Sequence, residues 1–298
     1  MGHRPGAPRR RRIPPHPRAQ GLPRGKEHQR VSPKARHPRE ELKSIIAGDK
    51  PQYVKELFDT IAEDYDRMNW IMTGGLLALW HRAFLRQTRL APGETALDVC
   101  CGTGDLTFLM ARRVGPRGAV TGLDFSENML AIARRRAEAL AAKEPGKLAP
   151  ITWTQGDALS LPFDDGDDDR GFAAVSMGFA LRNVGDIVQA LREMARVARR
   201  GGRIICLEVS RPKNPLLRAG FHIHFYRVVP ILGRMAERRL PQESPLRRLR
   251  PYTYLPYSLD HLPPPQGILA LMKEAGLIEA RQIPLTGGVV SLYVGVKP

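Results

Sequence analysis

The stretch 95–106, read T-A-L-D-V-C-C-G-T-G-D-L, constrains the fold more than any other part of the chain. A short apolar run that contains Asp98 leads into a glycine turn, and apolar residues then recur at helical spacing (Leu106, Leu109, Met110 and Val114). This pattern predicts a strand, a tight turn and a helix. Gly102 and Gly104 would let the backbone bend sharply and let a ligand approach the main chain. An ordinary turn between strand and helix can carry the same glycines, so the turn alone indicates a nucleotide-type pocket only weakly.

A second strand, predicted over 119–124, ends in another acid, Asp124. It follows the glycine turn by about twenty residues, where a carboxylate can accept hydrogen bonds from both hydroxyls of a ribose. Dinucleotide-binding enzymes share this device, but here the turn is G-T-G and an acid, Asp98, lies inside the first strand. A ligand with an α-amino group and a sulfonium suits this arrangement better than one with a pyrophosphate. We therefore predict that the chain binds S-adenosylmethionine.

Strands and helices alternate as far as residue 209, which predicts an α/β fold with a parallel sheet and right-handed crossovers. Further strands are expected over 151–154, 172–177 and 203–209, the last after a turn at Gly201-Gly202, and a closing hairpin over 277–283 and 289–296. The third strand delivers Asp157 and Ala158 to the edge where an acid and bare backbone can contact an adenine ring. The fourth delivers Arg182 and Asn183, the polar groups best placed to touch a methyl acceptor.

Two helical segments flank this core. Residues 51–90 are predicted to form an N-terminal helical cap, and residues 212–265 a helical insertion that interrupts the alternation. The insertion has an apolar, aromatic-rich helix bordered by arginines, which fits a membrane interface, a pocket for a lipophilic substrate or a lid packed on the core. His222 and His224 lie two residues apart and so do not share a helix face as a metal pair would.

The net charge of +17 is concentrated at the N-terminus, where residues 1–50 carry fourteen Lys/Arg against four Asp/Glu. This arm is rich in proline and poor in aliphatic residues, so we expect it to be disordered. A nucleic-acid or anionic-membrane contact, a transit peptide and a start codon assigned too far upstream are three possible origins; we expect a dispensable tail. No apolar run is long enough to span a membrane, and no secretory signal is recognised.

We expect no metal site. Cys100, Cys101 and Cys206 form no C-x-x-C pair, and they fit a reducing compartment and structural packing. The acidic run 164–169 lacks the spacing of a calcium loop and is interpreted as a solvated turn.

From about Tyr53 to Lys297 the chain resembles the UbiE/MenG-type C-methyltransferases of quinone biosynthesis. The resemblance rests on four motifs: Y-D-R-M-N-W-I-M-T-G-G with a downstream Trp80, L-D-V-C-C-G-T-G-D-L, G-F-A-L-R-N-V, and E-V-S-R-P followed by L-T-G-G-V-V. It implies a class I S-adenosylmethionine-dependent methyltransferase fold, Rossmann-like, with a seven-stranded mostly parallel sheet whose last strand is antiparallel. The positions that match the family's cofactor residues are Thr103, Asp124, Asp157, Ala158 and Gly178, the last a serine in many members.

The resemblance implies methyl transfer from S-adenosylmethionine to a ring carbon of a lipophilic polyprenyl quinol, foremost demethylmenaquinol in menaquinone biosynthesis. By hypothesis Arg182 stabilises the phenolate oxygen, Asn183 orients the ring, and Tyr65 or a histidine of the insertion relays the proton. The double cysteine is similar to cyanobacterial and plastid relatives, whereas the C-terminal third resembles bacterial menaquinone enzymes. A ubiquinone- or phylloquinone-pathway substrate is therefore an alternative.

Two rival classes remain. An RNA or DNA methyltransferase would explain the charge, but the N/D-P-P-Y motif typical of amino-methylating enzymes is replaced by G-F-A-L-R-N. A cofactor-binding scaffold without a working acceptor site is the non-enzyme alternative. We expect no specific nucleic-acid partner, and a cytoplasmic protein that associates peripherally with the inner face of the membrane.

Overall fold

The computed structural model describes residues 50–62, 73, 75–167, 170–231 and 251–298. All of them belong to one compact unit that spans residues 37–298. The predicted basic arm 1–50, apart from the first residue of helix α2, and the predicted site residue Tyr65 lie outside this description.

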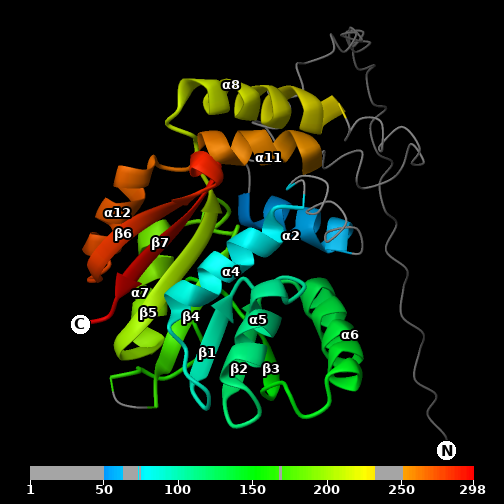
Figure 1. Ribbon diagram of the computed structural model, residues 1–298, viewed down its shortest axis with the longest axis vertical. Coiled ribbons are helices and arrows are strands. Elements are labelled where there is room, and N and C mark those ends of the chain that lie inside the picture. Colours follow the sequence, from blue (N-terminus) through cyan, green and yellow to red (C-terminus); the bar gives the residue numbers. More distant parts are fainter. Residues whose placement is uncertain (1–49, 63–72, 74, 168–169, 232–250) are drawn as a thin grey trace, which may run out of the picture. The chain divides into compact units, whose positions relative to one another are not determined.

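A seven-stranded sheet forms the centre of the unit, in the order β3-β2-β1-β4-β5-β7-β6 (Figure 1). Strands β1 to β5 pair in parallel, whereas β7 pairs antiparallel with both β5 and β6. The predicted class I methyltransferase sheet with an antiparallel last strand is thus confirmed. The strands are β1 (Thr95–Val99), β2 (Ala119–Asp124), β3 (Ile151–Gln155), β4 (Phe172–Gly178), β5 (Ala198–Val209), β6 (Ile278–Leu285) and β7 (Val290–Val296).

Helices cover both faces because successive residues of the central strands point to opposite sides. Ala96 packs with α4 (Leu77–Thr88) and α5 (Asp105–Val114) through Trp80, Phe84 and Met110. Leu97 belongs to the opposite core, which α7 (Ile187–Val197) and α12 (Pro265–Glu274) complete. The remaining helices are α2 (Lys50–Ile61), α6 (Glu127–Lys143), α8 (Pro215–Ile223), the π-helix η2 (His224–Val228), α11 (Pro251–Asp260) and the short η3 (Thr286–Gly288).

Strand β5 begins earlier than predicted. It starts at Ala198, and the pairing with β4 shifts from Phe172↔Ala198 to Ala174↔Arg203, so the extra residues form an irregularity within the strand. Gly201, with φ of 71°, allows the bend, and its N–H donates to Lys297 O at 3.0 Å. The expected turn is therefore wrong: the paired glycines bend a strand that continues through them.

The cap and the closing hairpin meet at one hydrogen bond. Trp80 Nε1 in α4 donates to Thr286 Oγ1 in the hairpin turn at 2.8 Å. This hydrogen bond thus connects two motifs that lie about 200 residues apart in the sequence. No helix within the described ranges is both long and apolar enough to cross a bilayer.

Candidate functional site: a two-part cavity at the carboxyl ends of the strands

The predicted glycine turn follows β1 and has an unusual backbone. Cys100, Gly102 and Gly104 all have positive φ, at 55°, 54° and 94°. A Cβ on Gly102 would meet nothing within 4 Å, so glycine serves the backbone angle there and leaves open space beside it. A Cβ on Gly104 would lie 2.9 Å from the Trp153 ring, and Gly104 lines neither cavity described below. In this structure the role of Gly104 is to begin α5 against packed rings.

Asp124 joins the ends of β1 and β2. Its Oδ2 accepts a hydrogen bond from Gly102 N–H at 2.8 Å, and its Oδ1 accepts from Ser126 N–H at 2.9 Å. Burial raises the pKa of the carboxyl to about 6 despite these backbone donors, and nearby Asp59 raises it further. A carboxylate has about four lone-pair sites, so Asp124 retains acceptor capacity for ribose hydroxyls.

Asp98 lies in the interior of β1 and is only 1% exposed. The carboxylate accepts hydrogen bonds from Thr107 Oγ1 on α5 and Ser176 Oγ on β4, both at 2.7 Å. The partners of Asp98 are thus hydroxyl groups from two neighbouring elements. Burial raises the pKa of this carboxyl to about 6, and the two hydroxyls oppose the shift.

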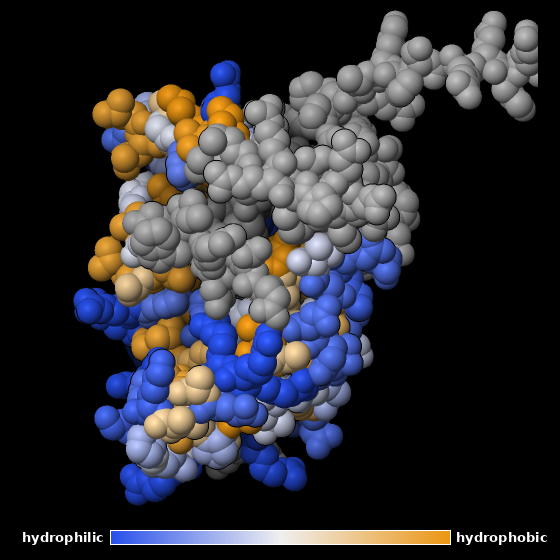
Figure 2. Space-filling model, turned by 90° about the vertical axis from the view of Figure 1, so that its right-hand side faces the viewer, coloured by the Kyte–Doolittle hydropathy of each residue, from blue (hydrophilic) through white to orange (hydrophobic). Residues whose placement is uncertain are grey.

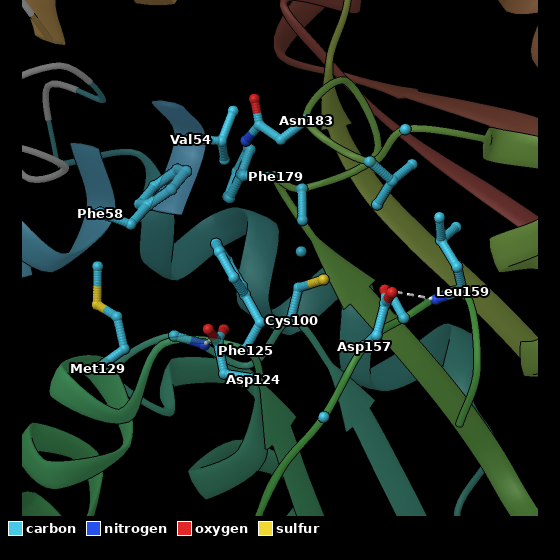
Figure 3. A pocket seen from close by; sticks show the side chains of 17 residues that line it. Val54, Phe58, Cys100, Asp124, Phe125, Met129, Asp157, Leu159, Phe179 and Asn183 are labelled. Carbon is cyan, nitrogen blue, oxygen red and sulfur yellow. Dashed lines mark hydrogen bonds between the residues drawn. The ribbon is translucent and has the colours of Figure 1, made fainter. Parts of the chain in front are cut away.

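Two adjoining cavities surround these acids. The larger, of about 930 Å³, lies between Asp124 and helix α2, and Figure 3 shows Val54, Phe58, Phe179 and Asn183 on one side of it and Asp124 and Asp157 on the other. The smaller, of about 460 Å³, contains Asp98 and the turn, together with His81 of α4. They share four lining residues (Cys100, Gly102, Gly178 and Phe179).

The chemistry of the linings fits the two ends of S-adenosylmethionine. The larger cavity offers an acceptor carboxylate beside apolar side chains (Phe125, Met129 and Leu159), which suits a ribose and a flat adenine ring. The smaller offers Asp98 and Thr103, which suit a cationic α-amino group. The Gly178 backbone lies where the cavities join, and a Cβ there would lie 2.7 Å from Leu106 Cδ1, so Leu106 fills the space that a larger residue would need.

The other predicted cofactor residues have distinct surroundings. Thr103 lines the smaller cavity, and its Oγ1 accepts a hydrogen bond from Arg136 at 2.8 Å. Asp157 lines the larger cavity, where its Oδ1 accepts from Leu159 N–H at 2.9 Å, and Ala158 lines it next to Asp157. The structure thus brings every predicted cofactor residue except Gly104 to the walls of these two cavities.

The two described residues that were predicted to contact the methyl acceptor, Arg182 and Asn183, have different surroundings. Arg182 is almost buried, forms an ion pair with the fully buried Glu208 on β5, and donates to Phe179 O at 2.8 Å. It does not line either cavity. Asn183 does line the larger cavity, and its Oδ1 accepts a hydrogen bond from Tyr254 Oη at 3.0 Å. In Figure 3 the Asn183 nitrogen points toward the cavity and its oxygen away from it.

Sequence reasoning did not identify Tyr254 or His81. Tyr254 reaches the site from α11 and packs on Tyr53 of α2 with ring centroids 5.4 Å apart; burial raises the pKa of its phenol far above the ordinary value. His81 reaches the smaller cavity from α4, where burial lowers its pKa and Asp105 raises it. No local motif marks either residue. His222 and His224, candidates for the proton relay, line neither of the two cavities.

A sheet of this order, with a two-part cavity at its carboxyl edge, defines the class I methyltransferases. The solved S-adenosylmethionine-dependent methyltransferase of Aquifex aeolicus superposes with a TM-score of 0.53 at 15% identity, covering 78% of this chain and 98% of that one. Residues 46–297 match the ubiE/COQ5 methyltransferase family, and the chain belongs to that family. The expected methyltransferase class and its methyl donor, S-adenosylmethionine, are thereby confirmed.

Curated relatives cover almost the whole matched region. The demethylmenaquinone methyltransferase of Symbiobacterium thermophilum is 44% identical over 249 residues, which is 84% of this chain and 94% of that protein. The demethylmenaquinone methyltransferase of Shouchella clausii is 36% identical over 253 residues, or 85% of this chain and all of that protein.

Cofactor affinity should fall in mildly acidic solution. Asp98 and Asp124 each have a pKa of about 6, and a cationic amino group and ribose hydroxyls favour the ionised carboxylates. Both acids are mostly ionised above that value and protonated below it, so affinity should drop by about tenfold per pH unit below 6 for each carboxylate that must ionise. Calorimetric titration with S-adenosylhomocysteine, a neutral-sulfur analogue, between about pH 5 and about pH 8 measures this. Constant affinity across that range would contradict it.

Proposed function

We propose that the protein transfers a methyl group from S-adenosylmethionine to a ring carbon of a polyprenylated demethylquinol, with demethylmenaquinol as the preferred acceptor. The two relatives described above are demethylmenaquinone methyltransferases, which supports this acceptor. The observation that carries the proposal furthest is the larger cavity, which extends from the cofactor acids to an apolar wall made by α2 and the loop after β4 (Val54, Phe58, Phe179, Ala180 and Val184). An aromatic ring can be buried against this wall while a polar group, Asn183, contacts its oxygen.

When bound, S-adenosylmethionine supplies an electrophilic methyl group with a good leaving group behind it. The protein then mainly contributes proximity and alignment, which can be worth roughly 7–11 kcal/mol of the barrier. Asp124 and Gly102 would hold the adenosine part, and Asp98 and Thr103 the amino-acid part. Because Asp124 bonds directly to the Gly102 N–H, cofactor binding and the shape of the turn depend on one carboxylate.

The acceptor oxygen gains negative charge as its ring carbon becomes nucleophilic, and we assign Asn183 to stabilise it. Tyr254 Oη donates to Asn183 Oδ1, which leaves the amide NH₂ to donate into the cavity. For Arg182 we propose a role other than the stabilisation of the phenolate expected from the sequence, since its charge is paired with the buried Glu208 and it lines neither cavity. We assign it to positioning the loop that carries Asn183.

Replacing Tyr254 with phenylalanine should lower kcat by up to about tenfold, because Asn183 loses the hydrogen bond that fixes its amide. The KM for S-adenosylmethionine should change little, since Tyr254 does not line the cofactor cavities. Steady-state kinetics with a short-chain demethylnaphthoquinol measures both constants. Tyr257→Phe on the same helix is the matched control. Equal kcat values for the two variants would refute the positioning role of Tyr254.

The substrate's polyprenyl tail partitions into lipid, so the proposed reaction requires peripheral association with a membrane. A benzoquinol of the ubiquinone pathway or a phylloquinone precursor is the alternative acceptor. A nucleic acid is the acceptor of a different class that the positive charge would favour.

A methylation assay with labelled S-adenosylmethionine tests the proposal. The full-length protein is incubated in parallel with a reduced demethylnaphthoquinol, a benzoquinol precursor and total RNA. We expect label in the naphthoquinol. Label in the benzoquinol alone would move the enzyme to the other quinone pathway, label in RNA alone would overturn the quinol proposal, and cofactor binding without label in any acceptor would indicate a scaffold.

A further inference from the structure

The helix formed by α8 and η2 presents an apolar surface that the described part of the chain does not cover. No residue of α8 is buried. Five of the seven large hydrophobic side chains that are exposed in the described residues lie between residues 216 and 231 (Leu216, Leu217, Ile223, Val228 and Ile231). Leu216 is 83% exposed. Orange atoms gather in Figure 2 at the height at which Figure 1 places α8. Such a concentration of exposed apolar groups indicates a contact surface.

A positively charged hollow adjoins this helix. Among the described residues, its lining combines basic and aromatic side chains with one carboxylate (Arg211, Arg218, Phe221, His222, Tyr226, Arg227 and Asp260). A second hollow shares Arg211 and Arg218 and adds Lys213. Basic side chains therefore border the exposed leucines and isoleucines along the same element.

The single carboxylate of the hollow is already engaged. Asp260 accepts hydrogen bonds from Arg211 at 3.0 Å and from Tyr226 Oη at 2.5 Å. Within the described residues, Lys213, Arg218 and Arg227 have no carboxylate partner. The sequence adds charge of the same sign directly afterwards, because residues 232–250 contain six arginines and two glutamates. The surface is thus complementary to an anion.

We propose that this face, made by α8, η2 and the adjoining hollow, docks the protein onto a bilayer that contains anionic phospholipid. The apolar side chains would enter the lipid boundary while Arg211, Arg218 and Arg227 contact phosphates, as in interfacial amphipathic helices. The inference rests on the proposed function in that it names the surface through which the enzyme would reach a lipid-dissolved substrate.

The position of α11 supports this orientation. This helix, which lies beside α8 in Figure 1, contributes Asp260 to the hollow and Tyr254 to the acceptor end of the cavity. One helix therefore joins the docking surface to the place where the quinol ring would bind. A bilayer under α8 would hold the quinol close to the Asn183 end of the site.

Other occupants fit this surface less well. A symmetric contact with a second copy would set the arginines of one chain against those of the other. A nucleic acid would match the charge but would leave large leucine and isoleucine side chains without an apolar partner. An anionic bilayer satisfies both features.

Vesicle co-sedimentation of the full chain tests the proposal. Vesicles of phosphatidylcholine alone are compared with vesicles of equal parts phosphatidylcholine and phosphatidylglycerol. We expect binding to the anionic vesicles, and a loss of about tenfold or more in partition coefficient for Arg218→Glu/Arg227→Glu. Arg117→Glu, an exposed charge in the loop before β2, is the matched control and should bind like the wild type. Equal binding by the double variant and the control would overturn the docking surface.

The apolar contribution is measured separately in high salt, where binding through the basic arm is screened. Leu216→Gln/Ile223→Gln should release most of the protein that remains bound there, whereas Ile278→Gln on β6 should not. Circular dichroism confirms that each variant is folded. A wild type that methylates a soluble short-chain quinol but binds no vesicle would refute the docking inference and leave the proposed function intact. Vesicle binding without quinol methylation would refute the proposed function and leave the docking inference intact.

Discussion

Replacing Arg182 with alanine is expected to lower the free energy of unfolding by about 3–5 kcal/mol, because the change leaves the Glu208 carboxylate buried without its cation. Glu208 is fully buried on β5, and its remaining partners are the backbone N–H groups of Arg182, at 3.3 Å, and Val209, at 2.8 Å. The loop that carries Asn183 should lose its anchor as well, so activity should fall even where the protein is still folded. Urea denaturation and initial-rate measurements give the two quantities.

Two comparisons make the Arg182 result specific. Arg192→Ala breaks an exposed ion pair with Glu274, at 3.4 Å, and should change stability by less than about 1 kcal/mol. The double variant Arg182→Met/Glu208→Leu removes both charges and should be more stable than Arg182→Ala alone. If Arg182→Ala unfolds at the same urea concentration as the wild type, the buried pair does not hold the loop.

Replacing Asp124 with alanine should weaken S-adenosylmethionine binding by about 100-fold or more, because it removes a buried acceptor for the ribose and the hydrogen bond that fixes Gly102. Isothermal titration calorimetry measures the dissociation constant, and thermal unfolding verifies that the variant remains folded. Asp157→Ala is the comparison: Asp157 is exposed, and its carboxylate accepts a hydrogen bond from Leu159 N–H and from no other described residue, so the loss should be much smaller. An unchanged dissociation constant for Asp124→Ala would show that the cofactor lies elsewhere.

The predicted sheet follows from local patterns, which explains why it could be predicted. Strands β1, β2 and β4 are short, mostly apolar runs, and β3 (I-T-W-T-Q) alternates apolar and polar residues. The helix after β2 is capped by Ser126, whose Oγ accepts a hydrogen bond from Met129 N–H. Such signals lie within a few residues of the element that they specify. The bend at Gly201 was misread because a pair of glycines marks a turn and a strand irregularity equally well.

The location of the predicted cofactor residues at one edge of the sheet was predictable for a related reason. Parallel strands have their carboxyl ends at one edge of the sheet, so the strand pattern alone brings Asp124 and Asp157, which follow or end neighbouring strands, to the edge where the turn after Asp98 lies. The hydrogen-bond partners of these carboxylates could not be predicted. Asp98 bonds to Ser176 because residues Asp98 and Ser176 are register partners in β1 and β4, and no sequence pattern states that register.

The proposed acceptor site depends on contacts between distant segments. The amide of Asn183 is oriented by a hydrogen bond from Tyr254, which lies 71 residues further along the chain. The guanidinium of Arg182 is paired with the carboxylate of Glu208 on β5. The sequence by itself determined the class of fold, the methyl donor and the edge of the sheet at which the predicted cofactor residues lie, since these depend on local periodicity and on turn chemistry. Only the tertiary structure decided that Asn183 lines the larger cavity and that Arg182 pairs with Glu208 instead, because this outcome depends on which side chains pack within hydrogen-bond distance of each other.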